Sequence, residues 1–484
     1  MGESTLKEKT SKGLFWGGMS SFLQQLLNAA FGIYLARTLS PDDYGLVGML
    51  AVFNMIALTL QEGGFVSALI NRKEIRHEDY NSVFWFNVLV SLGCYFLLFL
   101  SAPLIARYFH HPELIKLARW SFLSFVLAGL GTAHRAYLTK RLQVKEMAIV
   151  NITAVAISGL LGIYLARKGF AYWTLVIQAL VLGLLTNVGY WICSSWRPTF
   201  HIDFRPVKEM LRYSIKLVFT ICLGMVNSNL VTIILGRYYS AERVGYYTQA
   251  NKWSTMGVNV LSGMVNSVAQ PVFATVVDER ERQLRVFRKM IRFAAFISFP
   301  CMFGLAFVAP EFITLALSDK WKESVVLLQI LSVAGAVTPL IYICMNLLLS
   351  RGRSNQYMWG NIALLASTLA AVLLLYPWGI TYMVLGTSII NMFWLLVWVE
   401  LVRREIGYTY WQLLNDILPF LGFTVLSILA AWYVSGFIGN LVIRLTAKVL
   451  LTAALYIFVM WVTRSVTFRE CLYFLTKRKV KEDN

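Results

Sequence analysis

Amide side chains recur along several long apolar segments of this chain, often at helical spacing. An amide both donates and accepts hydrogen bonds, so a row of amides on one helix face can bind hydroxyl-rich or anionic groups. A polar group inside hydrocarbon costs free energy unless it faces protein or water. These residues therefore either line a wet passage that binds a ligand or form seams between packed helices. The candidate lining residues are Gln24, Asn28, Asn54, Asn227, Asn259 and Asn266.

Five charged residues lie in or at the ends of the same apolar segments. Lys252 could attract an anionic ligand, unless it pairs internally or extends to the membrane surface. Glu62 could pair with Lys252, take part in proton or cation coupling, or serve a structural role at the end of its segment. Arg37 and Arg237 each end an apolar run, where they could anchor to lipid headgroups or gate the outer mouth of a passage. Arg135 also lies near the end of a run, where it could be interfacial or contact a ligand.

The sequence contains no motif for catalysis, for metal binding or for a cofactor. Its six cysteines are scattered and form no C-x-x-C pair, so neither a metal site nor a disulfide framework is indicated. P-loop, G-x-G-x-x-G, H-E-x-x-H and D-x-D motifs are absent as well. We therefore expect no enzyme, no cofactor, and no catalytic or metal-binding residues.

We expect membrane-spanning helices to carry these side chains. The chain has 484 residues, of which 58% are hydrophobic and only 14% charged, and its mean hydropathy is +0.62. The apolar residues form blocks of about 20 or more, the length that crosses a bilayer as a helix. We predict an all-α polytopic membrane protein with about fourteen spans, at 13–36, 44–70, 81–106, 117–138, 147–166, 171–195, 213–236, 244–276, 290–315, 323–349, 357–376, 380–402, 415–436 and 441–463.

Two stretches of the chain repeat one pattern. The segments 35–45 and 235–245 share Leu, Arg, Ser and Gly at identical spacing. In the first copy Ser40, Pro41 and Asp43 are typical of a helix start, so each copy predicts a helix end followed by a new helix. A duplicated hydrophobic chain is typical of transporters built from two halves around a central cavity. We predict six-helix bundles over 1–195 and 213–402, a cytoplasmic linker over 196–212, and two further helices with a basic tail over 403–484.

The net charge of +19 is explained by membrane topology. Most of the 44 Lys and Arg residues fall in alternate loops, which is the pattern of the positive-inside rule. This distribution predicts that both termini are cytoplasmic, and it accounts for the basic character without a nucleic-acid partner. Residues 1–12 lack the apolar core and cleavage site of a signal peptide, so the first helix is expected to be retained.

The chain contains the motifs Leu35-Ala36-Arg37-x-Leu39-Ser40-Pro41-x-Asp43-Tyr44-Gly45, Glu62-Gly63-Gly64-Phe65, Ala309-Pro310, Trp321 and Leu328-Gln329-Ile330-Leu331. These motifs resemble those of polysaccharide flippases of the multidrug/oligosaccharidyl-lipid/polysaccharide (MOP) exporter superfamily. The sequence is most similar to the lipopolysaccharide, exopolysaccharide and teichuronic-acid exporters of bacteria. The resemblance implies two six-helix bundles around a V-shaped cavity, two peripheral C-terminal helices, and a location in the bacterial cytoplasmic (inner) membrane.

The resemblance also implies the cargo and the mechanism. Oligosaccharide repeat units on undecaprenyl pyrophosphate would move by alternating access from the cytoplasmic to the periplasmic leaflet, for surface polysaccharide biosynthesis. Members of the family tend to bind the pyrophosphate with cationic cavity residues, for which Lys252 is the best intramembrane candidate. Membrane lipids are expected partners, and a polysaccharide polymerase with its chain-length machinery is a potential one. Two alternatives stay open: a cation-coupled small-molecule or drug exporter of the same fold, and a membrane glycosyltransferase or polymerase.

Overall fold

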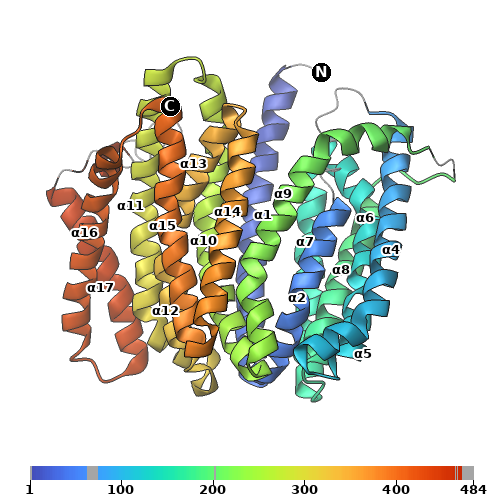
Figure 1. Cartoon of the computed structure of the whole chain (residues 1–484), viewed down its shortest axis with the longest axis horizontal. Helices are drawn as coiled ribbons and strands as arrows, with labels where there is room; N and C mark the ends of the chain where they lie inside the picture. Colours follow the sequence, from blue (N-terminus) through green and yellow to red (C-terminus); the bar gives the residue numbers. More distant parts are fainter. Residues whose placement is uncertain (1–2, 63–74, 201–202, 464, 466, 471–484) are drawn as a thin grey trace. The chain divides into compact units, whose positions relative to one another are not determined.

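The computed structural model describes residues 3–62, 75–200, 203–463, 465 and 467–470 (Figure 1). Within these ranges it describes side chains except at 3–15, 17, 57–62, 206–221, 267–268, 270–271 and 274. The described residues contain helices and no strand. The chain divides into two compact units, Met1–Gly245 and Tyr246–Asn484.

The first unit consists of eight helices and the start of a ninth, counted over the described residues. α10 (Ala241–Thr275) begins in this unit and continues into the second. The others are α1 (Glu3–Thr38), α2 (Pro41–Glu62), α4 (His77–Phe109), α5 (Leu114–Ser121), α6 (Leu123–Lys140), α7 (Val144–Arg167), α8 (Trp173–Cys193) and α9 (Arg205–Tyr238).

The second unit contains the remaining helices together with most of α10. Short turns of other helical types follow α11 and α14. The long helices are α11 (Arg280–Phe312), α12 (Ser324–Gly335), α13 (Thr338–Ser350), α14 (Ser354–Leu375), α15 (Ile380–Ile406), α16 (Tyr410–Ser435) and α17 (Leu441–Val462).

The predicted all-α membrane fold is confirmed. Within the described part of the chain, ten helical segments are long and apolar enough to cross a membrane. Four further long helices, α1, α2, α9 and α10, coincide with the first, second, seventh and eighth predicted spans. α5 and α6 together form the fourth predicted span, and α12 and α13 together form the tenth. The protein is therefore a multi-pass membrane protein.

The two repeat copies fold into the same helix end and restart. In the first copy Ser40 Oγ accepts a hydrogen bond from the backbone N–H of Asp43 at 3.2 Å. The Asp43 carboxylate in turn accepts from the backbone N–H of Ser40 at 2.9 Å, which completes the capping arrangement predicted from the sequence. In the second copy Ser240 Oγ accepts a hydrogen bond from the backbone N–H of Arg243 at 3.4 Å. The guanidinium of Arg243 cannot accept a hydrogen bond from the backbone N–H of Ser240, as the Asp43 carboxylate does from Ser40.

The glycine of each repeat copy lets two helix starts touch within the first unit. A Cβ on Gly45 would lie 1.8 Å from the carbonyl oxygen of Ala241. A Cβ on Gly245 would lie 1.9 Å from the carbonyl oxygen of Pro41. The two contacts are equivalent under the repeat, and any side chain would separate the helices. Close backbone approach therefore explains why both copies carry glycine at this position.

An apolar core packs α4 against α6 and α8 in the first unit. Tyr80 and Phe84 of α4 lie against Ala133 and Tyr137 of α6, with Trp196 just after α8. Aromatic rings meet edge to face in this cluster, for example Tyr80 with Tyr137 at a centroid distance of 5.5 Å. This packing fixes the position of α6 next to α8.

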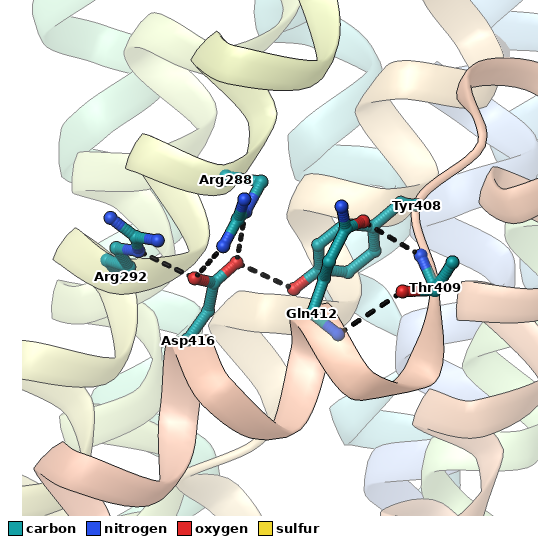
Figure 2. Close-up of polar contacts among 6 residues, drawn as sticks. All are labelled: Arg288, Arg292, Tyr408, Thr409, Gln412 and Asp416. Carbon is teal, nitrogen blue, oxygen red and sulfur yellow. Dashed lines mark hydrogen bonds and ion pairs between the residues drawn. The ribbon is translucent and has the colours of Figure 1, made fainter.

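In the second unit, a buried carboxylate ties α16 to α11. The side chain of Asp416 in α16 is fully buried. Arg288 of α11 holds both carboxylate oxygens at 2.9 Å, and Arg292 holds one of them at 2.6 Å (Figure 2). The hydroxyl of Tyr408 donates a further hydrogen bond at 3.2 Å. The carboxylate is thus neutralised and hydrogen-bonded where it is buried.

A second ion pair ties α17 to the opposite end of α11. Lys448 Nζ lies 2.8 Å from a carboxylate oxygen of Glu311, and both side chains are at most 10% exposed. Lys448 also lies over the ring of Phe307, 4.3 Å from its centroid. The two charged contacts hold the last two helices along the length of α11.

Candidate functional site

A polar cavity lies inside the first unit, between α1, α6, α7 and α8. Its volume is about 400 Å³, which is within the range of small-molecule sites in proteins. Amides, hydroxyls and one guanidinium make up its polar lining. The lining residues are Gln24, Ala128, Gly131, Thr132, Arg135, Met147, Asn151, Gly183, Thr186, Asn187 and Tyr190. We refer to this space as the polar cavity.

α6 and α8 meet at the wall of the polar cavity. Gly183, Thr186, Asn187 and Tyr190 occupy positions i, i+3, i+4 and i+7, so they lie on one face of α8. A Cβ on Gly131 of α6 would lie 1.6 Å from the side-chain oxygen of Asn187, so only glycine admits the amide there. Asn187 Nδ2 donates to the carbonyl oxygen of Gly183 at 2.8 Å, which fixes the orientation of this side chain.

Hydrogen bonds hold the polar side chains of α1, α7 and α8 in place. The hydroxyl of Tyr190 donates to the side-chain oxygen of Asn151 at 2.9 Å and so links α8 to α7. Gln24 Nε2 donates to Ser20 Oγ at 2.8 Å, within α1. The cavity therefore presents groups that already have defined positions, which lowers the entropic cost of binding a ligand.

The polar cavity carries a positive charge. Arg135 is the one charged residue among the described residues that line it, and no carboxylate is among them. A guanidinium remains protonated in proteins and has five N–H donors. Amides and hydroxyls around it can both donate and accept. This set of groups can bind an anionic, hydroxyl-rich ligand, and it offers no carboxylate to a cation.

Two of the predicted site residues, Gln24 and Arg135, line the polar cavity. Asn28 is exposed on α1 and is not part of the lining. Asn54 lies in a seam between helices, where its Nδ2 donates to Ser121 Oγ at 2.9 Å. Its amide is thus used in helix packing, which is the second of the two roles that the sequence left open.

The other predicted residues of the first unit lie away from this cavity. Asn227 is half-buried in α9, and its buried side-chain oxygen has no partner among the described residues. Arg237 at the end of α9 donates to the carbonyl oxygen of Tyr108 in the last turn of α4. Arg37 is exposed at the end of α1. The side chain of Glu62 lies outside the described residues.

The predicted residues of the second unit lie along α10. Lys252 is half-buried, with its Nζ 5.9 Å from the ring centroid of Trp253. Asn259 is exposed. Asn266 is also exposed, and its side-chain oxygen accepts a hydrogen bond from Asn346 Nδ2 at 2.8 Å.

Sequence reasoning did not identify most of the residues that line the polar cavity. One signal was present, because the α8 residues form a polar stripe at helical spacing inside an apolar span. The contribution of α6 was less visible, since Thr132 resembles many buried threonines. The missed polar residues are Thr132, Asn151, Thr186, Asn187 and Tyr190.

Comparisons with known proteins place this fold among polysaccharide biosynthesis proteins. A family model described as "Polysaccharide biosynthesis protein" matches residues 34–326, more than half of the chain. The chain is 26% identical over 428 residues to the lipopolysaccharide biosynthesis protein WzxC of Escherichia coli K12, covering 86% of each protein. It is 23% identical to the succinoglycan biosynthesis transport protein ExoT of Rhizobium meliloti, covering 80% of this chain and 76% of that protein. The solved structure of the lipid II flippase MurJ, in an inward closed conformation, superposes with a TM-score of 0.74 at 14% identity, over 94% of this chain and 99% of MurJ.

Proposed function

Because the chain belongs to the polysaccharide biosynthesis protein family, we propose that it is a flippase for lipid-linked oligosaccharides. It is a transporter and not an enzyme. Its cargo is an oligosaccharide repeat unit on undecaprenyl pyrophosphate, which it moves from the cytoplasmic to the periplasmic leaflet. The names of the relatives support this role, since one is a succinoglycan biosynthesis transport protein and another a lipopolysaccharide biosynthesis protein.

The observation that carries the proposal is the composition of the polar cavity. Arg135 supplies charge attraction for a phosphate, and Gln24, Asn151 and Asn187 supply adaptable hydrogen bonds for sugar hydroxyls. A diphosphate-linked sugar cannot enter hydrocarbon unaided, because its charges and hydroxyls would lose their hydration. A polar cavity within a membrane-spanning bundle replaces part of that hydration while the prenyl chain stays in lipid.

The same lining argues against the cation-coupled drug exporter of this fold. A cavity that binds lipophilic cations is expected to be apolar and aromatic and to contain a carboxylate. Among its described lining residues, the polar cavity has a guanidinium in place of a carboxylate. The charge of the site thus favours an anionic cargo.

Alternating access completes the mechanism that we propose. The repeat halves 1–195 and 213–402 would rock to expose the cargo to each leaflet in turn. Lys252 in the second half would provide a second attraction for the pyrophosphate, and Asn28, Asn227, Asn259 and Asn266 would contact the moving sugar. An inside-negative membrane favours outward movement of an anion by about 2.3 kcal/mol per charge per 100 mV, so no nucleotide is required.

The proposal includes a location and partners. The protein would reside in the bacterial cytoplasmic membrane with both termini in the cytoplasm. Its product would pass to a polysaccharide polymerase and the chain-length machinery on the periplasmic side. Arg37 and Arg237 would lie at the outer mouth, and Glu62 would be a charge partner or ion-coupling residue.

The test is complementation of a deletion strain, followed by analysis of lipid-linked intermediates in each leaflet. We expect the deletion strain to accumulate lipid-linked repeat units in the inner leaflet. The Arg135→Gln variant should restore translocation at about one tenth of the wild-type rate or less, which is the loss expected for one charge-assisted contact. Arg141→Gln is the matched control, because Arg141 is exposed and stacks on the ring of Tyr137 outside the cavity lining.

Three outcomes would contradict the proposal. The first is full translocation by Arg135→Gln, which would remove the cavity from the transport path. The second is sensitivity to lipophilic cations with normal surface polysaccharide, which would favour the drug exporter. The third is sugar transfer by the purified protein, which would favour a glycosyltransferase.

A further inference from the structure

An apolar groove lies beside the polar cavity, on different faces of the same two helices. Its volume is about 380 Å³. Its walls are formed by Leu127 and Leu130 of α6 and by Leu184, Val188 and Ile192 of α8. These five positions differ from those that line the polar cavity, and Asn187 of α8 lines both spaces. We refer to this space as the apolar groove.

The apolar groove opens toward hydrocarbon. Leu184 and Val188 are each 46% exposed, and Ile192 is 76% exposed. α8 is among the helices that are long and apolar enough to span a membrane, and only three of its residues are buried within the protein. Exposed aliphatic side chains on such a helix contact lipid chains rather than water. An acyl chain is therefore the natural occupant of the groove.

A fixed guanidinium stands at the end of this groove. Arg197 follows the end of α8 and lines the groove. Its Nη1 donates to the backbone carbonyl of Trp196 at 2.8 Å and also to that of Ser194. Its Nε and Nη2 have no partner among the described residues. The carbonyl contacts hold the side chain in place and leave donors available, which suits a phosphate.

The wall behind the guanidinium is rigid. Trp191 lines the groove, and its Nε1 donates to the carbonyl oxygen of Leu130 at 2.9 Å across the α6–α8 contact. The ring of His134 lies between Trp191 and Trp196, with centroid distances of 4.4 Å and 5.0 Å. Tryptophan is favoured at the level of lipid headgroups. The groove thus combines an apolar chain site with an anchored cation at headgroup level.

We propose that the apolar groove binds an anionic phospholipid of the bilayer, with an acyl chain along α6 and α8 and the phosphate on Arg197. The charge at the groove end selects an anionic headgroup over a zwitterionic one. Asn187 lines both the groove and the polar cavity, so the bound chain covers the thin wall between them. This assignment is independent of the transported cargo.

The test measures lipid binding by the full-length purified protein after delipidation in neutral detergent. Phosphatidylglycerol and phosphatidylcholine with the same acyl chains are titrated, and bound lipid is counted by native mass spectrometry. We expect wild type to prefer phosphatidylglycerol and Arg197→Gln to bind it about tenfold more weakly, as for the loss of one charge-assisted contact. Arg205→Gln is the control, because Arg205 is exposed outside the groove and pairs with Asp203 at 3.3 Å.

A second variant tests the groove itself. Val188→Trp would fill the space at an exposed position and should weaken binding of both lipids without affecting the fold. Unchanged binding by Arg197→Gln or by Val188→Trp would overturn the proposal. The proposal would also be overturned if a polyprenyl diphosphate displaced bound phosphatidylglycerol at a concentration below that at which phosphatidylglycerol itself binds. The groove would then be part of the cargo site.

Discussion

Arg135 of the first unit lines a cavity without a carboxylate among its described lining residues, whereas Asp416 and Glu311 of the second unit are held by cations at 2.6–2.9 Å and 2.8 Å. Asp416 and Glu311 are buried in a membrane protein, where an isolated ion is costly, whereas Arg135 is exposed at the edge of the polar cavity. In the second unit the charges neutralise one another and hold helices together. In the first unit the charge borders a space that a ligand can enter. The comparison thus sets buried ion pairs that join helices beside a charged residue that lines a cavity.

The largest expected effect is on stability, at the carboxylate of the second unit. Asp416→Asn leaves Arg288 and Arg292 facing each other with no counter-charge, so we expect a loss of about 3 kcal/mol in the free energy of unfolding. Thermal unfolding of the purified protein would measure it. Glu279→Gln serves as control, because its pair with Arg282 is exposed and is worth less than about 1 kcal/mol. Equal effects of the two variants would show that the buried contact has no special role.

The second ion pair offers a sharper form of the same comparison. Lys448→Met alone leaves Glu311 buried next to Arg444, whose nearest nitrogen is 3.9 Å away, and we expect a loss of about 2–3 kcal/mol. Adding Glu311→Leu to Lys448→Met removes the uncompensated charge and should restore most of that stability. If the double variant were less stable than the single one, the pair would not act as a mutually neutralising unit.

A smaller effect is expected at the wall of the polar cavity. Gly131→Ala places a Cβ against the side-chain oxygen of Asn187 and should displace that amide, at a cost of about 1–2 kcal/mol. The transport rate of the folded variant should also fall, because the amide moves within the lining of the polar cavity. In the background of Asn187→Ala the same substitution should be nearly neutral, and a double-mutant cycle on unfolding and transport measures this coupling. Additive effects would contradict the contact.

The smallest expected effect is at the amide that lies in a helix seam. Asn54→Ala removes the hydrogen bond to Ser121 and should cost about 1 kcal/mol in the free energy of unfolding. Transport by the folded protein should remain at the wild-type rate, because Asn54 is outside the lining of the polar cavity. A selective loss of transport would mean that this residue contacts the cargo after all.

The amino-acid pattern alone was sufficient to predict the helices and their repeated turn. Blocks of about 20 apolar residues must be helical in a bilayer, since every backbone polar group needs a partner within its own segment. Local signals were sufficient for Ser40 and Asp43, whose capping contacts span only three residues. The repeat has a glycine at the equivalent position of each copy. The reason for this glycine, the close contact of two helix starts, became clear only from the structure.

Which polar side chains share a site depends on how the helices pack against one another. Asn54 and Gln24 look alike in sequence, yet one lies in a seam and the other at the polar cavity. Asp416 meets its arginine partners across more than 120 residues of chain. Periodicity places a side chain on a face of its own helix, but the neighbour of that face depends on how the helices pack. The cavity and the ion pairs are therefore products of packing between distant segments.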